Sequence, residues 1–322
     1  MNSSFYQSLP TGAEEVRSGI TGARRRNPYI KPTLMYPTPP VSEPMCEPAD
    51  DKHAALIART DLRFLELPRP FATPHGVELP AFDEYGWEMG ESYEAMLEAR
   101  KPSLATRAAF HGIHHERRYE ALALTEFGIQ LAMMFNPYVL DFREQYGIYT
   151  SAAYWRARAR GKRLHRSQMT TIDIVVTYAR PPHFELQYHA ISVKSREYEP
   201  NEKDKRREIK ERTLVDERGW TWELMRSNAV PDQEVNNYVF LWTLIRMTSV
   251  RQLYEQSRQF ARDLITHSTR GSLHSVLERR ARGFGISTDM AYRLFASGVS
   301  YGFLTLDHSK RLGQELPLAL RD

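Results

Sequence analysis

Residues 170–194 read TTIDIVVTYARPPHFELQYHAISVK, and this stretch decides which fold the chain adopts. Its first part, residues 170–178, is β-branched almost throughout, which predicts a strand. A turn through Arg180, Pro181 and Pro182 leads to a second predicted strand over residues 184–194. Because this connection is short, we expect the two strands to pair antiparallel as a hairpin.

The segments around this hairpin predict an α/β fold with a mixed sheet flanked by helices. Residues 115–135 carry apolar side chains at helical spacing, namely Tyr119, Leu122, Ile129 and Met133. Asn136 and Pro137 end that helix. The predicted order is helix, strand, hairpin, helix and strand, over residues 115–135, 138–149, 170–194, 202–218 and 220–225.

The last part of the chain, residues 236–322, predicts an all-α domain of the winged-helix type. Amphipathic segments cover residues 249–267, 272–282 and 288–299, and Ser287 is a good N-cap for the last of them. The tail FLTLDHSKRLGQELPLAL then has two short β-prone runs around a polar turn. Such a pair of runs is typical of a wing.

The composition permits a DNA partner without demanding one. The chain has 322 residues, 41% of them hydrophobic, which is enough for two packed domains. Its net charge is +4 and its pI is near 9.0. The only cysteine in the sequence, Cys46, argues against a disulfide framework or a thiolate zinc site. No window approaches the ~18 apolar residues of a membrane helix, so we expect a cytoplasmic protein without a membrane partner.

Three ionisable residues in and before the hairpin suggest phosphodiester hydrolysis. Asp173 interrupts an apolar strand, Lys194 closes its partner strand, and Glu126 lies within the apolar stripe of the preceding helix. This hydrolysis needs carboxylates that hold a divalent metal and a cation near the phosphate. We expect Glu126, Asp173 and the backbone carbonyl of Val193 to bind Mg²⁺, which Mn²⁺ can replace, with Lys194 as the catalytic cation. The alternative is an ordinary Asp173–Lys194 ion pair and a satisfied core acid at Glu126.

A basic run directly before the first hairpin strand suggests contact with the DNA backbone. Residues 155–166 read WRARARGKRLHR, in which cations accompany an aromatic ring that can stack. The candidate DNA-binding residues are Trp155, Arg156, Arg158, Arg160, Lys162, Arg163 and Arg166. The alternative is a solvated basic loop without a partner.

The strand aspartate followed by Val193-Lys194 resembles the PD-(D/E)xK nucleases. Together with Glu126 and the triplet Arg143-Glu144-Gln145, this pattern resembles the TnsA family over about residues 115–226. The resemblance implies a restriction-endonuclease-like core with Glu126, Asp173 and Lys194 in the active site, and with Glu211 and Gln145 supporting it. The family usually has Gln or Glu where this chain has Ser192, so we expect Ser192 to be at most a weak metal ligand.

The resemblance further implies a role in transposition. It suggests cleavage of the non-transferred (5′) strand at transposon ends, in the nucleoid of a bacterium, with a TnsB-like transposase and a TnsC-like ATPase regulator. The composition along the chain predicts an extended arm (1–60) and a cover segment (61–110), for which the resemblance gives no counterpart. A nuclease domain (111–235) and a winged helix (236–322) follow. Two alternatives stay open: a stand-alone restriction or junction-resolving endonuclease, and a non-enzymatic DNA-binding assembly factor whose nuclease core has decayed.

Overall fold

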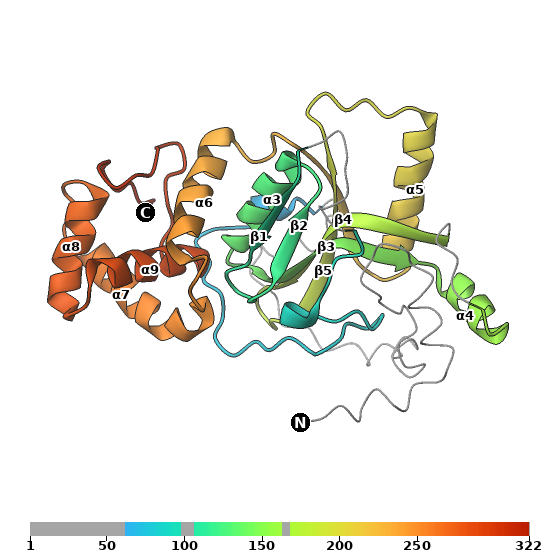
Figure 1. Ribbon diagram of the computed structural model, residues 1–322, viewed down its shortest axis with the longest axis horizontal. Helices are drawn as coiled ribbons and strands as arrows, with labels where there is room; N and C mark the ends of the chain where they lie inside the picture. The colour runs from blue at the N-terminus through green and yellow to red at the C-terminus, as the bar shows by residue number, and fades with distance from the viewer. Residues whose placement is uncertain (1–61, 98–105, 163–167, 322) are drawn as a thin grey trace.

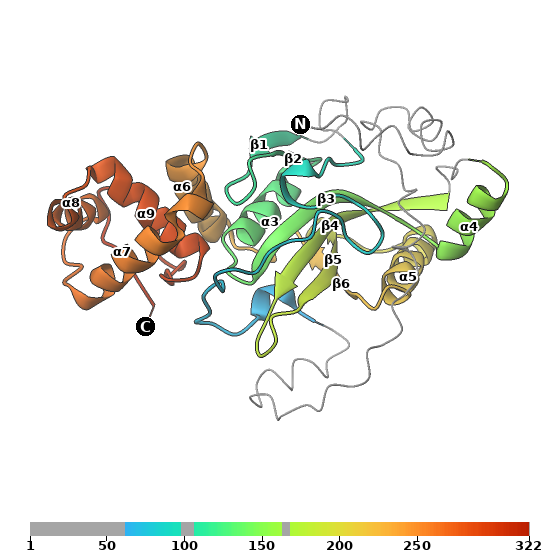
Figure 2. The ribbon, with the colours of Figure 1, turned by 90° about the horizontal axis from the view of Figure 1, so that it is seen from below.

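The computed structural model describes residues 62–97, 106–162 and 168–321 (Figure 1). A central sheet lies between helices, and a group of helices formed by the last third of the chain lies at one end of the molecule (Figures 1 and 2). The predicted arm, residues 1–60, lies outside the described residues. Among the helices that the structure describes, none is long and apolar enough to cross a membrane.

The central sheet is mixed and has four strands in the order β3-β4-β5-β6. Their bounds are Val139–Tyr149, Met169–Ala179, Leu186–Lys194 and Thr221–Arg226. The strands β3, β4 and β5 pair antiparallel, and β5 pairs parallel with β6. The parallel pair is joined through helix α5 (Glu202–Asp216), as a parallel connection requires a crossover. The predicted hairpin and the predicted mixed sheet are therefore confirmed.

Helices cover both faces of this sheet. On one face, the β4 residues Ile174 and Val176 share a core with Ile129 and Met133 of α3 (Leu124–Met134). On the other face, Val175 belongs to a second core together with residues of α5 and of α4 (Ser151–Ala159). The alternation of side chains along β4 thus sends neighbouring residues to different helices.

The helix predicted over residues 115–135 is wrong in its first half. Residues Arg118–Ala121 form strand β2, which pairs antiparallel with β1 (Ala108–His111), and α3 begins only at Leu124. A buried ion pair holds this segment extended, because Arg117 donates to both carboxylate oxygens of Glu144, at 2.9 and 2.7 Å. The backbone N–H of Glu120 donates to Glu144 as well. These long-range contacts override the local helical spacing.

The described residues 62–97, before β1, pack on the sheet through buried rings and the buried acid Asp83. They include the short 3-10 helices Phe64–Glu66 and Gly90–Ser92. The Asp83 carboxylate pairs with the Arg143 guanidinium and accepts from the Tyr146 hydroxyl at 2.7 Å. This segment therefore forms part of the folded core.

The C-terminal part is helical. Its helices are α6 (Asp232–Ile245), η6 (Val250–Leu253), α7 (Tyr254–Thr266), α8 (Leu273–Phe284) and α9 (Thr288–Ser300). The helices expected over residues 249–267, 272–282 and 288–299 are present. In the described tail, residues 301–321, the expected wing strands are reduced to the isolated bridges Ser272↔Pro317 and Leu306↔Leu320.

Candidate functional site

Strands β4 and β5 separate just before Asp173 of β4 and Lys194 of β5, two of the candidate catalytic residues. Their pairing runs from Ala179↔Leu186 to Ile174↔Ile191. Beyond that point β4 continues to Met169 beside β3, and β5 continues to Lys194 beside β6. The hairpin therefore opens at Asp173, and its open end also carries Ser192 and Lys194.

Asp173 bridges this opening. Its Oδ2 accepts a hydrogen bond from the backbone N–H of Val193 at 2.8 Å. This bond replaces the backbone hydrogen bond that would form there if the two strands stayed paired. Burial raises the pKa of this carboxyl, while the Val193 N–H and the Lys194 ammonium act in the opposite direction. Asp173 and Lys194 are therefore close enough for their charges to interact.

Glu126 reaches the same opening from the first turn of α3. Its Oε2 accepts the backbone N–H of Leu122 at 2.9 Å, which positions the carboxyl at the helix start. Burial, and next the negative charge of Asp173, raise the pKa of Glu126 to about 7. The two acids are close enough to repel one another, and Lys194 offsets part of that repulsion. The structure therefore brings Glu126, Asp173 and Lys194 together.

Lys194 and its surroundings lie at the end of β5. Its Nζ is 5.5 Å from the centre of the Tyr198 ring, and the Tyr198 hydroxyl donates to Glu208 at 2.7 Å. Tyr198 could not be singled out from the sequence, because an isolated aromatic after a strand carries no distinguishing signal. Its ring lies within the range of a cation–π contact with the ammonium.

Glu211 is held against the site from α5. Its side chain is only 1% exposed, and its Oε2 accepts the Ser192 hydroxyl at 2.6 Å. Its Oε1 accepts the Nε of Arg207 at 2.7 Å. The predicted supporting position of Glu211 is therefore beside Ser192. Sequence reasoning missed Arg207, although its spacing of four residues before Glu211 on a charged helix is a signal for such a pair.

Gln145 lies on β3, the strand that pairs with β4. It stands between the ladder pairs Glu144↔Ile174 and Tyr146↔Ile172, which places it opposite Asp173. Its φ is 49°, which a residue other than glycine rarely adopts, and its buried Nε2 has no partner among the described residues. A strained backbone and an unmet donor thus lie next to the candidate acid.

The oxygen donors at the opening match the preferences of Mg²⁺. Glu126 and Asp173 each use one carboxylate oxygen in a backbone hydrogen bond, which leaves the other for a metal. The carbonyl of Val193 points to the same side of β5 as its N–H, toward Asp173. In the described parts of the chain no three His, Cys, Asp or Glu side chains cluster tightly enough to hold a metal. The set fits an ion that keeps several waters.

The predicted DNA-binding residues lie on or just after helix α4, except for two that fall outside the described residues. Arg156, Arg160 and Lys162 are exposed on or just after α4, and Trp155 is half-buried beside Tyr154, with their ring centres 5.2 Å apart. Arg158 lies on the same helix. Arg163 and Arg166 fall outside the described residues. Helix α4 follows β3 and precedes β4, so it adjoins the end of the sheet where the hairpin opens (Figure 2).

Comparison with protein-family models and with curated proteins finds no match for this chain.

Proposed function

We propose that this chain is a Mg²⁺-dependent DNA endonuclease whose active site is the opening between β4 and β5. The observation that carries the proposal is the meeting of two acids with raised pKa values, Glu126 and Asp173, beside the Lys194 ammonium. Holding two half-buried acids that repel one another close together is unfavourable unless a cation compensates them. A divalent ion provides that compensation.

The metal ligands in this proposal are Glu126, Asp173 and the carbonyl of Val193. When bound, Mg²⁺ makes water a stronger nucleophile and offsets the charge that develops on the phosphate, and Mn²⁺ can take its place. The two backbone hydrogen bonds of the acids hold their carboxylates in position before the metal arrives. Less reorganisation is then needed on binding.

Lys194 and Glu211 have different roles. The Lys194 ammonium binds the scissile phosphate and stabilises its negative charge, a task suited to a compact point charge. Glu211 binds the Ser192 hydroxyl and so holds the end of β5 against α5. Ser192 already donates to Glu211, which supports a positioning role for it and leaves metal binding to the neighbouring groups.

Helix α4 is proposed to contact the DNA backbone. Asp173 lies four residues after the start of β4, which corresponds to about 13 Å along the strand. The exposed cations of α4 therefore lie near enough to bind phosphates adjacent to the one that is cleaved.

The proposed biological reaction is cleavage of the non-transferred (5′) strand at transposon ends, in the manner of TnsA, with a TnsB-like transposase and a TnsC-like ATPase regulator. Its support is that the residues carrying the resemblance, Glu126, Asp173, Lys194 and Glu211, lie around one opening. Such a reaction would place the chain at the bacterial nucleoid when it acts.

The C-terminal helices are proposed to form a reduced winged helix. The bridge from Ser272, before α8, to Pro317 and the bridge from Leu306 to Leu320 are the remnants of strand pairing that support this proposal. Helix α9 is buried from Ala291 onward except at Arg293, so its first turn and Arg293 are the parts of it that remain available to contact DNA.

The test is strand-specific cleavage of a plasmid carrying the transposon ends, with the transposase and ATPase of the same element supplied. We expect the wild type to cut the non-transferred strand in Mg²⁺, and Lys194→Ala to reduce that cut by about 100-fold or more. Lys203→Ala, an exposed lysine on α5, is the matched control and should cut normally. Cutting without the partners would identify a stand-alone nuclease. Equal products from wild type and Lys194→Ala would overturn the site assignment, because the chemistry would then lie elsewhere or the chain would be an assembly factor.

A further inference from the structure

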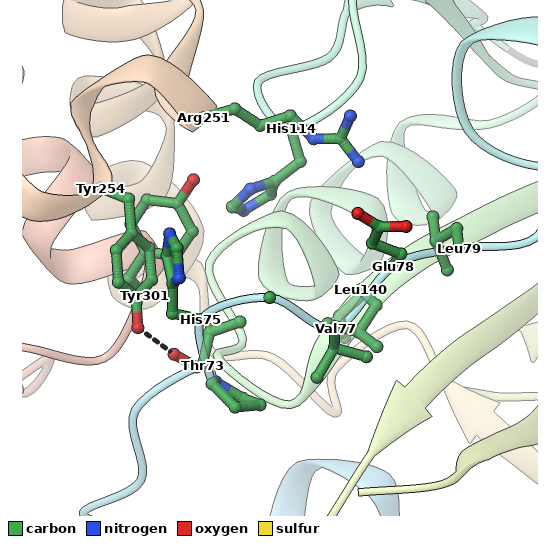
Figure 3. Close-up of a pocket in the computed structure, with 13 residues that line it drawn as sticks. Thr73, His75, Val77, Glu78, Leu79, His114, Leu140, Arg251, Tyr254 and Tyr301 are labelled. Carbon is green, nitrogen blue, oxygen red and sulfur yellow. Dashed lines mark hydrogen bonds between the residues drawn. The ribbon is translucent and has the colours of Figure 1, made fainter.

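A cavity of about 440 Å³, shown in Figure 3, is lined by none of the candidate active-site residues. Its walls come from residues 73–79, from the start of β3, and from Arg251, Tyr254 and Tyr301 of the C-terminal part. His114, which also lines it, bonds the carbonyl of Met134 at the last turn of α3. Glu126 is eight residues earlier, or roughly 12 Å along the helix. The cavity and the active site therefore lie at opposite ends of α3.

Arg251 and Tyr301, which line the cavity, offer hydrogen-bond donors to an anion. Arg251 forms no ion pair with any of the residues that the structure describes. The Tyr301 residue is only 5% exposed, but its hydroxyl is not among the enclosed side-chain atoms that lack a partner in the described residues, so it is open to the cavity that it lines. From there it can donate a hydrogen bond to an acceptor in the cavity. Arg251 and Tyr301 together suit a phosphate group.

Another side of the cavity is aromatic. The exposed ring of His75 lies 4.8 Å from that of Tyr254, measured between ring centres. The Tyr254 hydroxyl donates to the carbonyl of Thr73 at 2.7 Å, and the Tyr254 ring packs edge-on against Tyr301. These contacts hold the aromatic wall in place before any ligand binds. A flat ring can stack on it.

A third feature is an acceptor for N–H groups. The His114 Nε2 bonds a carbonyl at 3.1 Å, so this nitrogen carries the proton and Nδ1 keeps a lone pair. Burial lowers the pKa of His114 to about 4, so the ring is neutral near pH 7. The exposed Glu78 carboxylate at the rim is a second acceptor. A bare phosphate offers no N–H group to either, whereas a nucleobase does.

We propose that this cavity binds one deoxynucleotide, with its phosphate on Arg251 and the Tyr301 hydroxyl and its base against His75 and Tyr254. The cavity volume lies within the range of about 300–1,000 Å³ found for small-molecule sites. A free mononucleotide and the phosphorylated end of a DNA strand share this chemistry. The assignment does not depend on cleavage at the β4–β5 opening.

The experiment is a calorimetric titration of the full chain with dTMP, thymidine, inorganic phosphate and 5′-phosphorylated (dT)₄. We expect dTMP to bind more tightly than phosphate or thymidine. Arg251→Gln should weaken dTMP binding by about tenfold and Tyr301→Phe by about three- to tenfold, as expected for the removal of hydrogen bonds to a charged group. The matched control is Arg262→Gln, an exposed arginine of α7 outside the cavity, which should bind normally.

The two sources of the ligand are distinguished by affinity. Binding of 5′-phosphorylated (dT)₄ at least about tenfold tighter than dTMP identifies a strand end, and equal binding identifies a free nucleotide. Phosphate binding as tightly as dTMP, or no binding of any probe, overturns the proposal. Lys194→Ala should keep dTMP binding. Loss of binding in Lys194→Ala together with normal binding in Arg251→Gln would place the nucleotide at the active site instead.

Discussion

At the scale of single residues, the candidate site depends on how burial changes the chemistry of two acids. Glu126 and Asp173 lie on different elements, yet the charge of Asp173 is the second largest cause of the raised pKa of Glu126. Each acid is anchored by one backbone N–H rather than by a full ion pair. Their remaining oxygens are therefore available to a metal ion.

Glu126 makes the metal-free protein less stable as the pH rises. Its folded pKa of about 7 lies above the ordinary value of 4.5. Its contribution to stability is therefore fully present below pH 4.5 and is lost as the pH rises through 7. We predict that Glu126→Gln, compared with wild type in the absence of metal, has a relatively higher Tm at pH 8 than at pH 5. The same Tm difference at both pH values would contradict the raised pKa.

The site could be predicted from the sequence at some residues and not at others. Asp173 and Lys194 were accessible because a polar residue stands out in a β-branched run and strand alternation indicates its face. Glu126 lies on a helix as predicted, although that helix begins later than predicted. The Arg207–Glu211 pair within α5 does have a sequence signal in its spacing of four residues, whereas the contact of Tyr198 with Lys194 arises only in the folded chain and has none.

At the scale of elements, long-range contacts determine the secondary structure of segments whose local sequence pattern is ambiguous. The residues around Tyr119 fit a helical spacing, but the buried Arg117–Glu144 pair and the backbone of Glu120 hold them in β2. The β4–β5 hairpin has no such competitor, because its β-branched run disfavours a helix. This explains why the hairpin was predictable and the start of α3 was not.

Helix α4 should contribute to DNA affinity through charge. We predict that Arg156→Gln with Arg160→Gln lowers the affinity for duplex DNA and reduces the slope of log K against log salt by about one for each phosphate that the variant no longer neutralises. Salt-dependent fluorescence anisotropy measures this. Arg262→Gln serves as the control, since it removes an exposed arginine from α7. An unchanged slope in the α4 variant would mean that these arginines are merely solvated.

At the scale of the whole molecule, one hydrophobic core connects the sheet with the C-terminal helices. Phe135, just after α3, stacks on Tyr238 of α6 with ring centres 5.3 Å apart. The indole N–H of Trp242 donates to the carbonyl of His111 at 2.9 Å. The C-terminal helices therefore cover a surface of the core that would otherwise be exposed to water.

This shared core predicts that the two parts unfold together. We expect a single calorimetric transition for the full chain, and we expect Phe135→Ala to lower the Tm of the whole molecule, at a cost of about 3–5 kcal/mol. Two separate transitions, of which Phe135→Ala shifts only one, would show that the parts fold independently.

Cleavage by an Asp173 variant shows whether the opening between β4 and β5 is a metal-dependent nuclease site. The experiment measures Mg²⁺-dependent cleavage of end-bearing DNA by wild type, by Asp173→Asn and by the exposed control Asp216→Asn, with the partner proteins present. Asparagine keeps an oxygen that can accept the Val193 N–H, so the fold should be retained while the charged metal ligand is removed. We expect that Asp216→Asn cuts normally and that Asp173→Asn does not cut. Normal cutting by a folded Asp173→Asn variant would contradict this assignment.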